Sequence, residues 1–341
     1  MIVAAMQAPS PPPSIAPPPG LSPTDRLASE NARDADAGIR HGFAPVNGLN
    51  LHYAACGDPR RPLLLFLHGF PEFWFAWQPL LRAFGDEWLA VAPDQRGYNL
   101  YDKPAALEAY RPRQLMDDVL GLIDHFGHRR ATLVAHDWGG AVAWNFAARH
   151  ADRLDALVAI NAAHSVPFAR DLAGHAGQRQ ASQYMLSYRQ PGIESALAAD
   201  GCAALLDKLG RHSTDARWLD ADTRARYLEA WTQPGALTGG LNWYRASPLH
   251  PPTADEPGAG GITLDPAKFR VEVPTLVIWG ERDPHLLPCL LDGLEALVPD
   301  LSVVRDAHGS HWIVHERTAF VIDIMRRWLD GRPRTARGEP A

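Results

Sequence analysis

The sequence contains few cysteines, no long apolar run and no excess of positive charge. Its three cysteines, Cys56, Cys202 and Cys289, are far apart and include no CxxC pair, which argues against a disulfide framework and a zinc knuckle. No apolar stretch approaches the roughly eighteen residues that a membrane span requires. The formal net charge of -6 provides no attraction to nucleic acid or to an anionic membrane surface. We therefore expect a protein of the reducing cytoplasm that binds neither nucleic acid nor membrane.

The two ends of the chain differ in composition from the rest. Residues 1–6 carry no positive charge before the prolines begin, so a secretory signal is not expected. Residues 7–24 are rich in proline and cannot bury enough apolar surface to offset the entropy of ordering. We predict a disordered extension over residues 1–37 and a flexible tail over residues 332–341.

Between these ends, compact apolar segments alternate with helical patterns. The strand-like segments are residues 63–67, 88–92, 131–135, 154–160, 274–279 and 301–304. The helical patterns are residues 113–126, 141–149, 287–297 and 318–329. Several of the strand-like segments are almost continuously apolar, which is typical of strands buried on both faces. Two further short strands flank Asn47-Gly48, a strong hairpin signal. This pattern predicts an α/β fold, with a mostly parallel sheet and helices on both faces.

One long part of the chain has a different pattern. From Pro167 to Ile262 the strand-like runs stop, and amphipathic helical patterns appear between prolines and glycines. We interpret residues 167–265 as a helical cap, inserted before the next strand and placed over the strand ends. Residues 251–261 read as a flexible return linker. The α/β core then consists of residues 38–166 and 266–331.

The strand at residues 131–136 leads into a candidate nucleophile. A nucleophile elbow requires small residues two positions before and two after the reactive side chain, because the strand turns sharply into a helix. Ala135 and Gly139 satisfy this requirement around Asp137. Most hydrolases with this turn carry serine at its apex. An aspartate before a helix can also be a simple N-cap, so the neighbouring motifs have to decide.

Those motifs supply the other parts of a hydrolase site. An apolar strand runs into His68-Gly69-Phe70-Pro71, a turn that brings the Phe70 N–H toward the elbow, where the Trp138 N–H is the second oxyanion donor. Asp283 ends a later strand, and His311 follows the last one. The order Asp137, Asp283, His311 is that of nucleophile, acid and histidine in α/β-hydrolases. His308 is an alternative to His311, and His308, His311 and His315 together are an alternative metal site.

Taken together, these motifs resemble the epoxide hydrolase branch of the α/β-hydrolase superfamily. The resemblance is carried by His68–Glu72 with Trp74, Pro93–Tyr98 with Asp102–Pro104, His136–Gly140 and the Asp283/His311 pair. It covers nearly everything from residue 40 to residue 330. Ala135, where glycine is usual, and Tyr101, where serine is usual, are mild departures. The resemblance implies that His68, Pro71, Trp74 and Trp243 lie at the substrate pocket.

The chemistry of the residues fits this family. An aspartate has an ordinary pKa near 4, so it is ionised at neutral pH and can displace a leaving group at a saturated carbon without a base. The resulting ester on Asp137 would be hydrolysed by water that His311 activates, with Asp283 orienting the imidazole. The substrate partners are then a small hydrophobic epoxide and water. No cofactor and no metal are expected, and the protein is expected to be a monomer or a homodimer.

The leaving group separates epoxides from halides. An epoxide oxygen needs an acid, and the resemblance implies two cap tyrosines for this role, Tyr184 and Tyr244, with Tyr188 as an alternative to Tyr184. A haloalkane or haloacid dehalogenase using the same nucleophile is the runner-up. Phe70 stands where many haloalkane dehalogenases have asparagine, and no arginine follows Asp137 as it does in fluoroacetate dehalogenases. A non-catalytic binding member of the fold is the third possibility.

Overall fold

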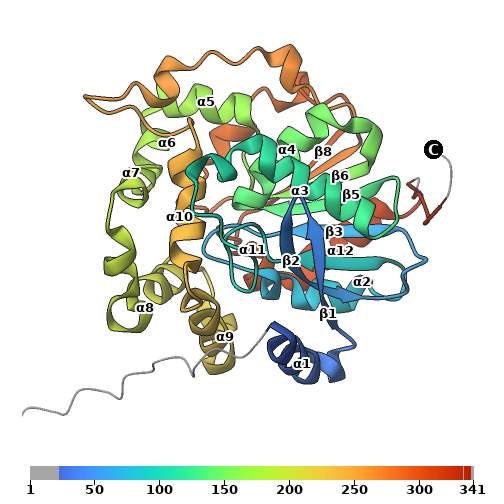
Figure 1. Cartoon of the computed structure of the whole chain (residues 1–341). Helices are drawn as coiled ribbons and strands as arrows, with labels where there is room; N and C mark the ends of the chain where they lie inside the picture. Colours follow the sequence, from blue (N-terminus) through green and yellow to red (C-terminus); the bar gives the residue numbers. More distant parts are fainter. Residues whose placement is uncertain (1–22, 333, 339–341) are drawn as a thin grey trace, which may run out of the picture.

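The computed structural model describes residues 23–332 and 334–338, and its centre is a single eight-stranded sheet (Figure 1). The strands follow the order β1-β2-β4-β3-β5-β6-β7-β8 across the sheet. They are β1 (Arg40–Val46), β2 (Leu49–Cys56), β3 (Leu63–Leu67), β4 (Leu89–Pro93), β5 (Ala131–His136), β6 (Leu154–Ile160), β7 (Thr275–Gly280) and β8 (Leu301–Asp306). From β4 to β8 every neighbouring pair is parallel, while β2 pairs antiparallel with β1 and β4.

The apolar runs of the sequence form the middle of this sheet. Every residue of β3, β4, β5 and β7 is buried, as expected for parallel strands with helices on both faces. Helices α3 (Pro112–His125) and α4 (Asp137–Arg149) cover one face, and α2 (Gln78–Phe84) and α12 (Thr318–Leu329) cover the other (Figure 1). The predicted mostly parallel α/β architecture is confirmed.

The hairpin predicted at Asn47-Gly48 joins β1 to β2. Both residues have positive φ, +51° and +76°, as a two-residue turn of this kind requires. The pairing of Val46 with Leu49 then fixes the register of the two strands. The hairpin prediction is therefore confirmed.

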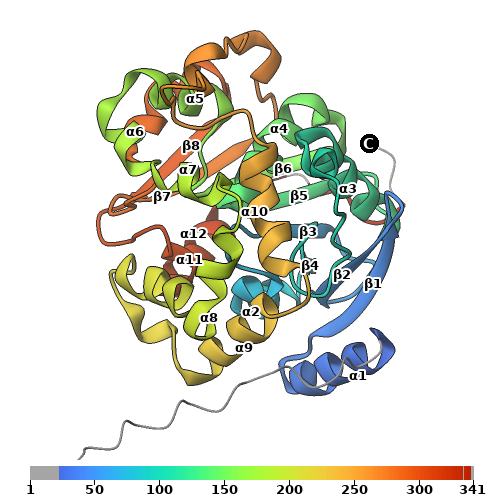
Figure 2. The ribbon, with the colours of Figure 1, turned by 60° about the vertical axis from the view of Figure 1, so that its left-hand side comes forward.

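Between β6 and β7 the chain forms six α-helices, which we call the helical segment. They are α5 (Ser165–Gly174), α6 (Ala176–Ala181), α7 (Tyr184–Arg189), α8 (Ile193–Arg211), α9 (Ala221–Trp231) and α10 (Ala236–Ala246). In Figure 1 most of these helices stand together to the left of the sheet, and Figure 2 shows α10 in front of it. No helix in the described part of the chain combines the length and apolar character needed to cross a bilayer.

The N-terminal region is more ordered than its composition predicts. Residues 1–22 lie outside the described residues, but Pro23–Asp34 forms helix α1, so the predicted disorder up to residue 37 is wrong for this part. Asp34 is buried, and its carboxylate accepts hydrogen bonds from Arg226 (2.9 Å) and from His41 (3.1 Å). These contacts, one to a residue 192 positions away and one to a residue seven positions away, fix the end of α1.

Two other predictions, both for the C-terminal half of the chain, are corrected. Residues 287–297 form two short 3-10 turns instead of a helix, because Gly293 adopts φ +82° between them. Part of the tail predicted to be flexible is docked, since the backbone N–H and hydroxyl of Thr335 both donate to Asp155 at 2.8 Å. Residues 333 and 339–341 lie outside the described residues.

Candidate active site

The predicted elbow is a sharp turn at the junction of β5 and α4. Asp137, the first residue of α4, has φ +50°, a left-handed conformation that is uncommon for residues other than glycine. The glycines after it allow close packing of this turn. A Cβ on Gly139 would lie 2.2 Å from the carbonyl oxygen of Leu67, and one on Gly140 would lie 2.0 Å from the Cβ of Ala162. The turn therefore requires glycine at both positions.

The carboxylate of Asp137 faces the loop that follows β3. The backbone N–H of Phe70 donates to Asp137 Oδ1 at 2.8 Å. A Cβ on Gly69 would lie 2.2 Å from the same oxygen, so only glycine permits this approach. Trp138 is the second residue of α4, and its N–H is among the first four of the helix, which have no carbonyl partner within it. Both predicted oxyanion donors are thus positioned by the elbow and by the loop after β3.

The three residues of the predicted triad come from three separate strand ends and meet. His311 Nδ1 donates to Asp283 Oδ2 at 2.7 Å, and His311 Nε2 lies 3.6 Å from Asp137 Oδ2. The second distance is too long for a direct hydrogen bond. The imidazole therefore has one nitrogen fixed by Asp283 and the other directed toward the elbow carboxylate.

Asp283 is held by more partners than the sequence indicated. Its Oδ1 accepts the backbone N–H groups of His285 (2.7 Å) and Leu286 (2.9 Å). Its Oδ2 also accepts the side-chain amide of Asn161 at 2.8 Å. Asn161 follows β6 and hydrogen-bonds the end of β7 as well. A single asparagine after a strand gives no sequence signal of this role.

The charges of the Asp283–His311 pair influence each other. Burial would raise the pKa of Asp283, but the neighbouring His311 and the hydrogen bonds that the carboxylate accepts bring it below its ordinary value. Burial would likewise lower the pKa of His311, and the carboxylate of Asp283 raises it above its ordinary value. The imidazole can therefore take up a proton near neutral pH.

A second carboxylate, that of Glu72, stabilises the backbone of the site through His136. Glu72 is almost completely buried and contacts His136 Nδ1 (3.0 Å), His315 and the hydroxyl of Tyr227 (3.2 Å). His136 Nε2 in turn donates to the backbone oxygen of His311 at 2.8 Å. The pKa of Glu72 is lowered because these histidines outweigh its burial. The sequence motif contained Glu72, but nothing in it indicated this structural role.

Three tyrosines of the helical segment pack over the elbow. The ring centroids of Tyr184, Tyr188 and Tyr244 lie 5.1–6.1 Å apart, and Tyr244 packs edge-on against Trp138 (5.0 Å) and Phe70 (5.5 Å). Burial raises the pKa of Tyr184 and Tyr244 well above the ordinary value, and the charge of Asp137 adds to this. Both phenols therefore remain protonated at neutral pH and can donate hydrogen bonds.

A small cavity of about 50 Å³ lies beside the carboxylate of Asp137, and both Tyr184 and Tyr244 line it. An apolar cavity of about 230 Å³ shares the walls formed by Trp138 and Phe168. Asp137 and the two tyrosines therefore face a mostly apolar space.

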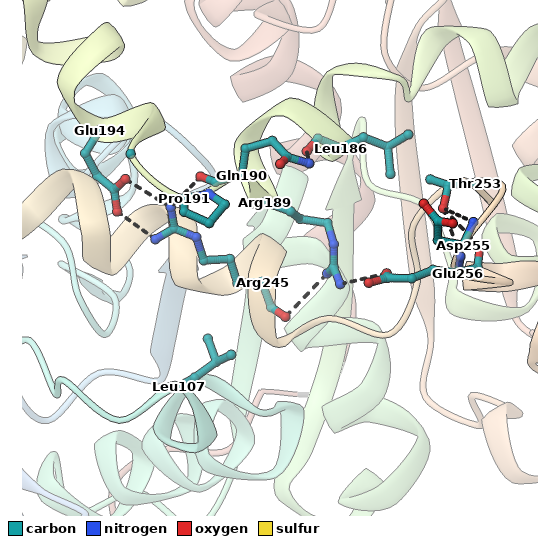
Figure 3. Close-up of a pocket in the computed structure, with 11 residues that line it drawn as sticks. Leu107, Leu186, Arg189, Gln190, Pro191, Glu194, Arg245, Thr253, Asp255 and Glu256 are labelled. Carbon is teal, nitrogen blue, oxygen red and sulfur yellow. Dashed lines mark hydrogen bonds and ion pairs between the residues drawn. The ribbon is translucent and has the colours of Figure 1, made fainter.

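A larger cavity, of about 720 Å³, lies elsewhere, and its lining includes the charged side chains of Arg189, Glu194, Arg245 and Glu256 (Figure 3). Its rim is held by ion pairs between Arg245 and Glu194 (2.7 Å) and between Arg189 and Glu256 (3.6 Å). None of the predicted triad residues lines it. Size alone therefore does not locate the reactive site in this molecule.

The structure corrects two predicted pocket residues on the core side. His68 is buried, and its Nε2 accepts the backbone N–H of Gln95 at 3.0 Å, so this nitrogen is bound to the loop after β4. Trp74 is fully buried and packs against the ring of His41 at 4.7 Å. Both side chains hold the loop after β3 in place and do not line the cavity beside Asp137.

The other two predicted pocket residues lie just behind the cavity walls. The carbonyl of Pro71 accepts the indole N–H of Trp231 at 2.6 Å, which ties the loop after β3 to the helical segment. The indole N–H of Trp243 donates to the carbonyl of Arg96 at 2.9 Å, and its ring packs against Trp138. Neither lines the cavity beside Asp137, because each is committed to joining the helical segment to the core.

The alternative interpretations of the C-terminal histidines do not fit the geometry. His308 is exposed, whereas His311 is buried against Asp283. His315 contacts Glu72 instead of joining His311 at a shared metal position. The three histidines therefore diverge toward different partners.

Comparison with known proteins agrees with this geometry. The alpha/beta hydrolase fold family matches residues 62–318. The AB hydrolase superfamily protein YfhM of Bacillus subtilis is 37% identical over 294 residues, covering 86% of this chain and 98% of its own. Epoxide hydrolase 3 of Xenopus tropicalis is 32% identical over 316 residues, covering 89% of this chain and 82% of its own.

Solved structures give the same result. A Bacillus megaterium epoxide hydrolase in complex with an inhibitor superposes with a TM-score of 0.77 at 33% identity, covering 85% of this chain and 100% of its own. An epoxide hydrolase from hot-environment metagenomes gives a TM-score of 0.78 at 36% identity, covering 86% and 99%. This chain is therefore a hydrolase of the alpha/beta hydrolase fold and belongs to the epoxide hydrolase family.

Proposed function

We propose that this protein hydrolyses small hydrophobic epoxides to vicinal diols through a covalent ester on Asp137. One observation carries the proposal: the carboxylate at the elbow lies between the Phe70 N–H and the His311 imidazole, and the phenols of Tyr184 and Tyr244 line the cavity beside it. A nucleophile and two candidate acids for the departing oxygen thus line one small cavity, and a base lies 3.6 Å from the nucleophile. The helical segment acts as a cap in this proposal, because it provides the phenols.

In the first step Asp137 attacks a carbon of the epoxide ring. The ionised carboxylate needs no base, and the ring opens as a phenol of Tyr184 or Tyr244 donates its proton to the oxygen. Both phenols are protonated beforehand, since burial raises their pKa. The product of this step is a hydroxyalkyl ester of Asp137.

In the second step water hydrolyses the ester. His311 takes a proton from the water, and Asp283 stabilises the imidazolium that forms. The water adds to the carbonyl carbon of the Asp137 ester, and the carbonyl oxygen of that ester develops negative charge. The N–H groups of Phe70 and Trp138 stabilise that charge, and the diol leaves as its departing oxygen takes the proton of the His311 imidazolium.

Halide displacement is the second candidate function, because it uses the same nucleophile and base. Trp138 lines the cavity and could offer an N–H to a halide. A halide ion, however, needs no proton, so two protonated phenols that line the cavity favour an epoxide oxygen as the leaving group.

The proposal is tested with styrene oxide in oxygen-18 water. Under single-turnover conditions the label is expected in Asp137 and not in the diol, because the ester is cleaved at its carbonyl carbon. Asp137→Ala should abolish diol formation. Release of chloride from a chloroalkane at a rate equal to or above that of diol formation would instead favour the dehalogenase.

A further inference from the structure

Lys208 of α8 lies against the tyrosines of α7. Its ammonium Nζ donates to the hydroxyl of Tyr188 at 3.0 Å. The same nitrogen lies 4.0 Å from the ring centroid of Tyr184 and 4.7 Å from that of Tyr188. Helices α7, α8 and α10 pack on one another, which places this cation next to the tyrosines that face the cavity (Figure 2).

This cation has no counter-ion in direct contact. Among the described residues no carboxylate lies within ion-pair distance of Lys208. Burial lowers the pKa of Lys208 to about 8, while the more distant charges of Asp137 and Asp283 oppose that shift. The ammonium therefore remains largely protonated at neutral pH, although a partly buried charge without a carboxylate partner is unfavourable. The position of Lys208 beside the tyrosines therefore calls for a functional explanation.

The cation also distinguishes the two phenols that line the cavity. Tyr184 has an ammonium over its ring, whereas no cation of the described residues lies over the ring of Tyr244. Burial opposes the loss of the proton from either phenol. Of the two phenols that line the cavity, only Tyr184 has this positive charge beside it, 4.0 Å from its ring centroid, and a nearby positive charge offsets the penalty for losing the proton.

We propose that Lys208 is a positioning residue that makes Tyr184, rather than Tyr244, the proton donor to the opening epoxide. The inference rests on the proposed function. Lys208 does not line the cavity, so it acts on the substrate only through the tyrosine. Tyr244 then orients the epoxide oxygen with a hydrogen bond but keeps its proton.

The proton inventory of this step is complete. As an oxygen of Asp137 bonds to the ring carbon, the electron pair of the broken C–O bond stays on the epoxide oxygen, which takes the proton of Tyr184. The ester formed on Asp137 is neutral, so a charge that raised the pKa of Tyr184 disappears in the same step. After hydrolysis the carboxyl group of Asp137 ionises, and its proton returns to the Tyr184 tyrosinate.

Lys208→Met and Lys208→Arg test the proposal in single-turnover experiments that measure ester formation and ester hydrolysis separately. At pH 7 we expect Lys208→Met to slow ester formation about tenfold or more while ester hydrolysis is unchanged. Lys208→Arg should restore most of the rate, because arginine keeps the charge. Arg211→Met is the matched control, since Arg211 lies on the same helix, exposed and paired with Asp207.

The pH profile gives a readout that a merely structural lysine would not change. The groups that face Lys208 are Tyr184, Tyr188, His212, His285, Asp137 and Asp283. The pKa of both histidines is lowered by burial, and that of both tyrosines is raised by burial. Wild-type ester formation should therefore decline above about pH 8 as Lys208 loses its proton, and Lys208→Arg should remove this decline.

A double-mutant comparison separates the two phenols. Lys208→Met should have no further effect in a Tyr184→Phe background and its full effect in a Tyr244→Phe background. Equal effects in both backgrounds, or an unchanged rate in Lys208→Met with wild-type Tyr184, would overturn the proposal. If the wild-type protein forms no ester on Asp137 from any epoxide, the proposed function fails, and that result is visible before any Lys208 variant is made.

Discussion

The two halves of the site are built on different physical principles. On the core side, the reactive groups are charged and are positioned by hydrogen bonds, as with Asp283, which accepts two backbone N–H groups, an amide and an imidazole. On the side of the helical segment, the groups are neutral phenols positioned by ring packing. In the proposed function, the core makes and cleaves the covalent bond, and the helical segment supplies the proton.

This contrast predicts that substitutions in the two halves of the site impair different steps of the reaction. Replacing both Tyr184 and Tyr244 with phenylalanine should slow ester formation by about 10³-fold, within the range for loss of general acid catalysis. The hydrolysis of an ester already formed should keep its rate, because the core is untouched. The measurement is rapid-quench detection of the protein mass. Unchanged epoxide turnover in this variant would refute the role of the phenols.

His311→Gln is the converse variant on the core side. Ester formation should continue, since Asp137 needs no base, but hydrolysis should stop. Intact-protein mass spectrometry should then show an increase equal to one substrate molecule. A His311→Gln protein that gains no mass while it still folds, as judged by circular dichroism, would contradict the division into two steps.

Asp283→Asn tests the core side through the pH dependence of ester hydrolysis. His311 acts as a base only when neutral, so ester hydrolysis declines as the pH falls through the pKa of His311, which Asp283 raises. Without that carboxylate, burial alone should lower the pKa, and the decline should move to lower pH. The rate at neutral pH should fall on the order of 10²-fold because the imidazole loses its orientation. A decline that stays at the same pH would show that Asp283 does not set the pKa of His311.

Glu72→Gln should have the smallest effect on the chemistry, because Glu72 contacts the histidines behind the site and none of the reacting groups. We expect a loss of about 3 kcal/mol in the free energy of unfolding, because buried histidines lose their charged partner. The folded-state pKa of Glu72 is depressed, so its contribution is fully present above the ordinary value of 4.5 and is lost as the pH falls. The gap in urea-denaturation stability between wild type and variant should therefore shrink in acid.

Glu87→Gln is the control for that experiment. Glu87 lies at the surface in an ion pair with Arg334, and its removal should change stability by less than about 1 kcal/mol. An equal loss in the free energy of unfolding in both variants would mean that the buried contacts of Glu72 stabilise the fold no more than a surface ion pair does.

The sequence by itself determined the sheet, the elbow and the identity of the charged residues. Continuous apolar runs form strands only where both faces are covered, and small residues around Asp137 permit the sharp turn, so both could be predicted locally. The order of Asp137, Asp283 and His311 along the chain indicated that they meet, because parallel strands end at the same edge of a sheet.

Only the tertiary structure decided which groups surround those residues. Asn161, Glu72 and Lys208 hydrogen-bond side chains 122, 64 and 20 residues away, to which no local pattern refers. Likewise, His68 and Trp74 belong to motifs beside the site, yet their side chains are directed into the packing behind it. A motif fixes where the backbone passes, whereas the direction of a side chain depends on the space and hydrogen-bond partners that the rest of the fold leaves to it.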